Sequence, residues 1–247
     1  MIQLFLIQLF GHMVGDFYLQ GERMCSFKRE KGWKSGWLYV HMLLVFAVAW
    51  AVSWSAGFWW AALLIAVLHG LTDMAKSRME RQGKMANVLF GLDQVMHVVI
   101  IALVVWLYSL CCGWTEWAWL TNYRAAMILG VVFCLWPANF FIGDFLKAIK
   151  VEKKDAEGAG AEADSTKVTL DASRVIGSIE RVLVFLFVWL GQYSAIGFLM
   201  AAKSVMRFPE MGQGKNAEYY LVGSLLSFGL AIVMAATIIA LHGKGLL

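Results

Sequence analysis

The stretch "NVLFGLDQVMHVVIIALVVWLYSLCC", residues 87–112, decides the fold class of this protein. Asp93 and His97 are its acidic and basic side chains, and the part after His97 is almost entirely apolar. At about 1.5 Å per residue, a helix of this length crosses the roughly 30 Å core of a bilayer. Because every backbone amide in lipid must bond within its own segment, the stretch is predicted to be a transmembrane helix.

Six further apolar segments accompany it, which gives about seven predicted spans. Hydrophobic residues make up 60% of the 247 residues, and the mean hydropathy is +0.66, values typical of a membrane protein. Twelve tryptophans fit the aromatic belts of membrane interfaces. The predicted fold is therefore all-α, a polytopic transmembrane helical bundle. Its predicted spans are 2–20, 36–56, 58–76, 87–112, 124–146, 179–202 and 218–241.

The connections between these segments differ in their content of Lys and Arg. The first, "GERMCSFKREKGWKSG", and the third, "KSRMERQGK", are rich in both, and so is the fifth, 147–174. The alternate connections hold only Arg124 and then Lys203, Arg207 and Lys215. The positive-inside rule then predicts an N-terminus outside and a C-terminus in the cytoplasm of a bacterial inner membrane.

The first apolar segment has no basic region before it, because the first positive side chain is Arg23. We therefore expect this segment to stay as a span instead of being removed as a signal peptide.

Composition also excludes two classes of function. Most Lys and Arg lie in the connections between apolar segments and form no aromatic-interleaved basic surface of the kind that binds single strands, so the net charge of +4 does not indicate a nucleic-acid partner. The four cysteines form no CxxC pair, which argues against a disulfide framework or a zinc ribbon.

The stretch "VEKKDAEGAGAEADSTKV", residues 151–168, is the low-complexity segment of the chain. Its composition buries too little apolar area to order itself. It predicts three parts: a five-helix membrane module at 1–150, a disordered cytoplasmic linker at 151–175, and a two-helix membrane module at 176–247.

Four of the five histidines and three aspartates lie in the first four segments. Three His–Asp pairs have a spacing of four residues, which places both side chains on one face of a helix. The predicted topology puts all seven residues roughly 5–15 Å from the cytoplasmic boundary, so they should converge on one site. The seven are His12 and Asp16 in "HMVGD", His41, His69 and Asp73 in "HGLTD", and Asp93 and His97 in "DQVMH".

Imidazole and carboxylate groups are ligands for divalent transition metals. Seven donors exceed one tetrahedral site, so one or two ions of Zn, Fe or Mn are expected. The four histidines are predicted ligands, and Asp16, Asp73 and Asp93 are predicted ligands, orienting groups or catalytic bases. Two alternatives remain open: the pairs bond helices together, or they form a path for protons or ions.

Other polar residues extend this picture. Gln94 is positioned to join the site, whereas Lys76 is expected to reach the cytoplasmic interface. Lys203 and Arg207 are expected near Glu218, either as interfacial ion pairs or as a site for lipid headgroups, since Arg207 suits bidentate phosphate binding.

Together, "HMVGDFYLQ", the lone histidine of the second segment, "HGLTDMAK" and "DQVMH" resemble a family of uncharacterised polytopic membrane proteins of bacteria. The resemblance covers about the first hundred residues. It implies a shared fold and no established activity.

The expected function is metal-dependent hydrolysis of a lipid-like or membrane-associated substrate that enters from the inner leaflet, with membrane lipids as partners. A proton or divalent-metal transporter is one alternative, and it predicts polar residues toward the outer side, where Gln3 and Gln8 stand out. A structural or regulatory membrane subunit, whose linker recruits a cytoplasmic partner, is the other.

Overall fold

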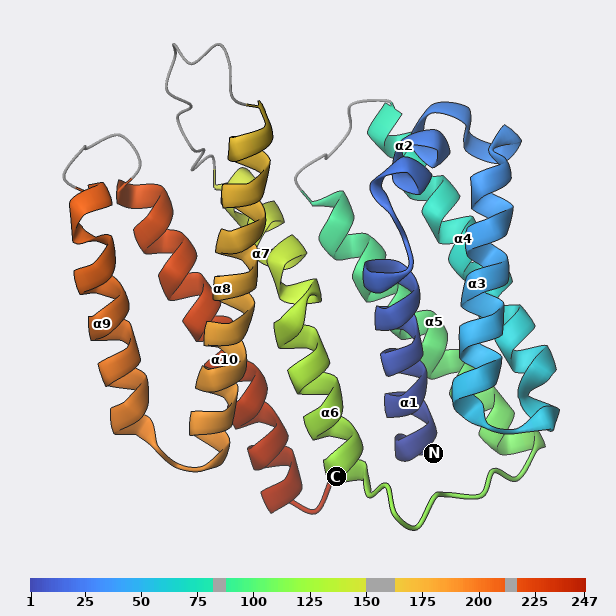
Figure 1. The fold of residues 1–247 in the computed structure, drawn as a ribbon. Coiled ribbons are helices and arrows are strands. Elements are labelled where there is room, and N and C mark those ends of the chain that lie inside the picture. Colours follow the sequence, from blue (N-terminus) through green and yellow to red (C-terminus); the bar gives the residue numbers. More distant parts are fainter. Residues whose placement is uncertain (82–87, 150–162, 212–216) are drawn as a thin grey trace. The chain divides into compact units, whose positions relative to one another are not determined.

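The computed structural model describes residues 1–81, 88–149, 163–211 and 217–247 (Figure 1). All regular elements in these ranges are helices, which confirms the predicted all-α class. The chain divides into two compact units, Met1–Leu129 with Leu247, and Gly130–Leu246. Of the linker predicted at 151–175, residues 151–162 lie outside the described residues, and residues 163–175 belong to the helix α8 (Ala163–Trp189).

The first unit contains the predicted site and is built from α1 to α5. Helices α3, α4 and α5 follow the predicted segments 36–56, 58–76 and 87–112 closely. Helix α3 packs against α1 and α4, and α4 packs against α5. The elements are α1 (Ile2–Met13), the π-helical turn η1 (Val14–Tyr18), α2 (Glu22–Lys31), the 3₁₀ turn η2 (Gly32–Lys34), α3 (Gly36–Ser53), the 3₁₀ turn η3 (Ala56–Phe58), α4 (Trp59–Arg81) and α5 (Leu89–Cys111).

Helix α2 lies within residues 21–36, which were predicted to be a connection between two spans. The chain bends by 87° between the α1 segment and the α2 segment, and α2 packs on α3 and α4. Met24 and Lys28, four residues apart, are its buried side chains among the residues described. Figure 1 shows α2 at the end of the bundle where α3 begins and α4 ends.

The interior of this unit is apolar away from α2, and its outer surface is apolar as well. Leu43, Leu103 and Leu110 are 65%, 57% and 65% exposed, an arrangement that suits contact with lipid. Four described helices are long and apolar enough to cross a membrane, or up to six spans if each of two bent pairs counts as one. The buried core includes Leu4, Val45, Phe58, Ala61, Ile65, Ile101, Val104 and Tyr108.

In the predicted segment 124–146, the helix is broken. Helices α6 (Asn122–Leu135) and α7 (Pro137–Ala148) meet at an angle of 54°. Pro137 begins α7 and has no N–H to continue the ladder of α6, and it forces Trp136 out of helical geometry, with φ −132° and ψ −51°.

The prediction of one continuous helix over 179–202 is wrong. Helix α8 (Ala163–Trp189) ends and α9 (Tyr193–Met211) begins on either side of Gly191, whose φ of +70° is left-handed and stops the helix. Lys203 of α9 forms an ion pair with Glu180 of α8, so the two helices form an antiparallel hairpin. Helix α10 (Ala217–Gly243) packs along α8 and corresponds to the predicted segment 218–241.

Candidate metal centre

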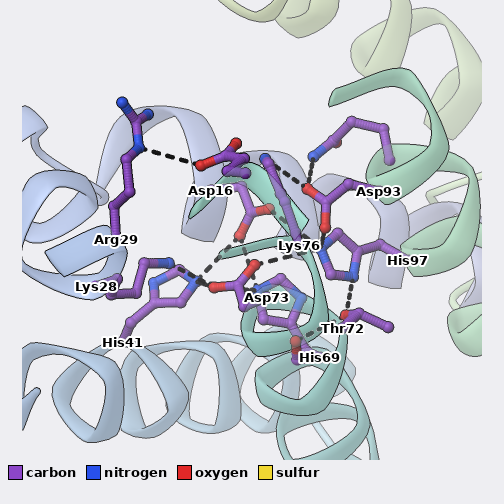
Figure 2. Close-up of polar contacts among 12 residues, drawn as sticks. Asp16, Lys28, Arg29, His41, His69, Thr72, Asp73, Lys76, Asp93 and His97 are labelled. Atoms are coloured by element: carbon purple, nitrogen blue, oxygen red, sulfur yellow. Dashed lines mark hydrogen bonds and ion pairs between the residues drawn. The ribbon is translucent and has the colours of Figure 1, made fainter. Parts of the chain in front are cut away.

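All seven predicted site residues lie together in the first unit, and their side chains are buried. Figure 2 shows six of them, drawn from η1, α3, α4 and α5, and His12 of α1 completes the set. The rings of His69 and His97 stack at 4.0 Å between centroids, and those of His41 and His69 are 5.1 Å apart. Four imidazoles and three carboxylates therefore occupy one small volume.

The π-helical turn η1 sets the position of Asp16. A π turn is wider than an α turn and is frequent at functional sites. Asp16 remains 3.8 Å from His12, measured Oδ2 to Nδ1, but its Oδ1 reaches toward the histidines of α3 and α4. The spacing of four residues predicted the contact of Asp16 with His12, but it did not predict the contacts of Asp16 with His41 and His69.

One group of ligand atoms consists of Asp16 Oδ1, His41 Nε2 and His69 Nε2. The two nitrogens are 3.0 Å apart, and Asp16 Oδ1 lies 3.3 Å from His41 Nε2 and 3.2 Å from His69 Nε2. Ligand atoms about 2.0–2.1 Å from a tetrahedral metal are separated by about 3.3 Å. The spacing of these three atoms thus fits the edges of a metal site.

A second group surrounds His97 Nε2. Asp93 Oδ1 is 3.4 Å from this nitrogen, Asp73 Oδ1 is 3.7 Å and Asp16 Oδ2 is 4.0 Å. Asp73 Oδ2 faces the first group, 3.7 Å from His41 Nε2. Asp16 and Asp73 therefore each direct one oxygen toward each group. Every ligand atom in the triplets His12–Asp16–His69, His41–His69–Asp73 and Asp73–Asp93–His97 lies within 4.8 Å of the others in its triplet, close enough to hold an ion.

Hydrogen bonds fix which nitrogen of His97 is free. Thr72 Oγ1 donates to the carbonyl oxygen of His69 at 2.7 Å, so it accepts the hydrogen bond from His97 Nδ1 at 3.1 Å. In the neutral ring, His97 Nε2 then directs a lone pair at the oxygens of Asp73 and Asp93. Groups of facing lone pairs need a cation between them, either a proton or a metal ion.

The same logic applies to His12. Its Nε2 lies 3.3 Å from Oε1 of Gln94 and donates to that oxygen, which leaves Nδ1 free toward Asp16. Metal-binding histidines usually donate their second N–H in this way. Gln94 thus contacts the cluster, as its position in the sequence indicated, whereas no signal in the sequence pointed to Thr72.

Several buried atoms in the cluster make no hydrogen bond within the described residues. They include Asp16 Oδ1, Asp93 Oδ1 and His97 Nε2, all of which face the cluster. An unsatisfied buried polar atom costs about 1–3 kcal/mol, so such atoms require an explanation. An ion in each of the two groups would satisfy them.

Two lysines contact the carboxylates from the α2 end of the bundle. Lys28 of α2 forms an ion pair with Asp73, and Lys76 Nζ lies 2.9 Å from Asp93 Oδ2 (Figure 2). Lys76, which was expected to reach the interface, pairs with Asp93 of the cluster while its side chain stays 25% exposed. The sequence did not indicate that Lys28 belongs to the site. The one feature that could have done so is its spacing of four residues from Met24, which places both on one face of a short helix.

On the other side of the cluster the bundle is closed by apolar packing. The buried core of α1, α3, α4 and α5 occupies this side, and its two glutamines are engaged by backbone groups. Gln8 Nε2 donates to the carbonyl oxygen of Ala49 at 3.0 Å, and Gln3 bonds to the backbone of Trp117 and Leu120. These glutamines do not extend the cluster.

The second predicted set lies in the other unit. Lys203 pairs with Glu180 of α8, and its ammonium lies 5.0 Å from the centre of the Phe228 ring. The side chains of Arg207 and Glu218 lie outside what the structure describes.

The first unit is thus a bundle of membrane-type helices with a buried His/Asp cluster of metal-ligand type. The profile of the family described as "Protein of unknown function (DUF3307)" matches residues 4–128, about half of the chain. The chain belongs to this family, and the matched residues coincide with the first unit. Comparison with the curated proteins and with the solved structures found no match.

Proposed function

We propose that this protein is an integral protein of the bacterial inner membrane that holds divalent metal in α1 to α5 and hydrolyses a lipid-like or membrane-associated substrate. The observation that carries the proposal is the spacing of Asp16 Oδ1, His41 Nε2 and His69 Nε2 at 3.0–3.3 Å with no hydrogen-bond donor for the carboxylate oxygen. A hydrogen bond between the two imidazoles would account for the His41–His69 contact, but it leaves Asp16 Oδ1 without a donor, which packing between helices does not require.

Two ions fit the donor set better than one. Asp16 and Asp73 each present one oxygen to the group around His41 and His69, and the other to the group around His97. Carboxylates that face two sites in this way serve as bridges between two metals, which stand about 3.5–4 Å apart in two-metal enzymes. His12 Nδ1 is the remaining histidine ligand.

Hydrolysis suits this ligand set because Zn, Fe or Mn bound by imidazole and carboxylate lowers the pKa of water and polarises the scissile bond. The chain supplies the proton acceptor. Asp93 has one oxygen held by Lys76 and the other free of hydrogen bonds, so it is the best placed to accept a proton from the attacking water.

Transport receives less support from the structure. A relay across the bundle needs polar groups at successive depths. The core beyond the cluster is apolar, and Gln3 and Gln8 are committed to backbone carbonyls.

Orientation is part of the proposal. We place the N-terminus outside and the cluster and α2 on the cytoplasmic side, where the basic connections lie. We also place α8 and α9 as two separate crossings, which brings the seven predicted segments to eight crossings and puts the C-terminus outside as well. Lys203 then lies toward the cytoplasm, in better agreement with the positive-inside rule.

The test is the metal content of full-length protein purified in detergent without chelators, measured by mass spectrometry for wild type, His12→Ala, His97→Ala and His242→Ala. His242, at the end of α10, is outside the cluster and serves as the matched control. We expect one to two ions per chain in wild type and His242→Ala, and a clear loss in the other two variants. Absence of metal from wild type, with no rebinding, contradicts the proposal.

The same preparations separate hydrolysis from mere binding. Metal-loaded wild type is incubated with a bacterial lipid extract, and cleavage products are followed by mass spectrometry. Products should appear with wild type and His242→Ala and disappear after chelation. If wild type binds metal but forms no product, the metal site is supported and the proposed hydrolysis is rejected.

A further inference from the structure

We propose that the group cleaved at this centre is a phosphate ester, and that Lys28 and Lys76 bind its phosphate. The inference rests on the proposed function and names its substrate class. It begins from the two ammonium groups that meet Asp73 and Asp93 at the α2 end of the cluster.

Lys28 is an unusual residue for its place. It is 7% exposed, and it comes from a short helix that crosses the end of the bundle, not from the bundle itself. Lysines of an interfacial helix ordinarily extend toward water, as the exposed Lys31 does. Lys28 points inward, and Arg29 beside it pairs with Glu80 of α4 at 3.1 Å, which fastens α2 over the cluster.

Charge balance then indicates what the site lacks. The three carboxylates and two ammonium groups leave one net negative charge while the histidines are neutral. One divalent ion makes the cluster positive by one charge, and two ions make it positive by three. A buried excess of positive charge is costly unless an anion accompanies it.

Binding of metal would also release Lys28. An ion in the group around His41 and His69 would compete with the Lys28 ammonium for Asp73 Oδ2, whereas Lys76 would stay on Asp93 Oδ2, because Asp93 faces His97 with Oδ1. The freed Lys28 ammonium and the partly exposed Lys76 ammonium would then both lie beside the metal centre. A phosphate accepts hydrogen bonds from several donors at once, and lysine is a common phosphate ligand.

The chemistry of a phosphate ester agrees with this setting. Water adds to phosphorus, the P–O bond to the alcohol breaks, one proton of the water passes to a carboxylate such as Asp93, and this carboxyl group returns the proton to the leaving alkoxide, which departs as the alcohol. Two-metal centres stabilise both the attacking and the leaving oxygen of such displacements. A neutral carboxylic ester would leave the two lysines without a role.

Lipid phosphates and free phosphate share this chemistry, so the experiment contains both. Metal-loaded full-length protein in detergent is titrated by calorimetry with inorganic phosphate and, separately, with short-chain phosphatidic acid. The variants are Lys28→Met, Lys76→Met and Lys28→Arg, with Lys31→Met as the matched control on an exposed position of α2. Metal content is measured for every sample.

We expect Lys28→Met and Lys76→Met to weaken binding by about tenfold or more, the effect of losing a charged hydrogen bond. Lys28→Arg should retain most of the affinity, and Lys31→Met all of it. Metal content should stay at the wild-type level in every variant. Preference for phosphatidic acid identifies a lipid substrate, and equal affinity identifies a soluble phosphate ester.

Two results would overturn the inference. One is metal-loaded wild type that binds neither probe, and the other is Lys28→Met and Lys76→Met binding as tightly as wild type. In either case metal is present, so the metal centre survives and only the phosphate assignment fails. Wild type without metal rejects the proposed function itself.

Discussion

His97 owes its orientation to one hydroxyl group. Thr72, one turn after His69 on α4, bridges the His69 carbonyl oxygen and His97 Nδ1, and so couples α4 to α5 at the level of the cluster. A residue that orients a histidine is hard to predict from sequence, because the position of a threonine in an apolar helix does not distinguish such a role from ordinary packing. The histidines and aspartates were predictable because charged groups are rare at that depth of a membrane.

Thr72→Val keeps the shape of the side chain and removes the oxygen that accepts from His97. We expect metal affinity to fall about 10- to 100-fold, the usual cost of losing the partner that orients a histidine ligand. Competition with a chelating dye measures the affinity, and Thr72→Ser should remain near wild type. An unchanged affinity in Thr72→Val would show that Thr72 does not orient His97.

At the scale of helices, apolar runs predicted α3, α4, α5 and α10 well and failed at four places, one of them the bend at Pro137 between α6 and α7. Gly191 divides one run into two helices, because a single left-handed residue leaves hydropathy unchanged. Val14–Tyr18 forms a π turn, which periodicity cannot distinguish from an α turn. Glu22–Lys31 forms α2, a helix too polar for an apolar-segment search to detect.

Close packing in the second unit depends on Gly130 of α6. A methyl group there would lie 2.6 Å and 2.7 Å from two ring carbons of Phe185, which is fully buried and cannot move aside. Overpacking costs about 1–3 kcal/mol, against about 1 kcal/mol gained in helix propensity.

We therefore expect Gly130→Ala to lower the Tm by a few degrees in detergent, followed through tryptophan fluorescence. Gly229→Ala on α10 is the control, because no atom lies within 4 Å of its added methyl group. Equal Tm values for the two variants would argue against tight contact of α6 with α8.

At the scale of the molecule, the sequence predicted a helical membrane protein, and the described residues agree in class. The number of spans was harder to predict from the sequence, because the bend at Pro137 and the turn at Gly191 depend on local backbone geometry and not on hydropathy. If α8 and α9 each cross the membrane, as proposed, the chain ends on the side opposite to the one predicted, so one glycine would alter the topology of the whole protein.

Reporter fusions distinguish the two topologies. Alkaline phosphatase fused after Leu247 should be active, because it folds outside, and the same reporter fused after Ile149 should be inactive. Green fluorescent protein should give the opposite pattern. A fluorescent fusion after Leu247 would instead support seven crossings and a cytoplasmic C-terminus.

The ion pairs of α2 have one further consequence. Apolar packing closes one side of the cluster, and α2 is fastened over the other through Lys28 and Arg29. If the cluster holds metal as proposed, an ion that exchanges with the medium would have to wait for the buried Lys28–Asp73 pair to open. Exchange would then be slow and little affected by salt, because buried ion pairs are screened far less than exposed ones, and the ion bound in the cell would reflect the supply at the time of membrane insertion as well as equilibrium preference.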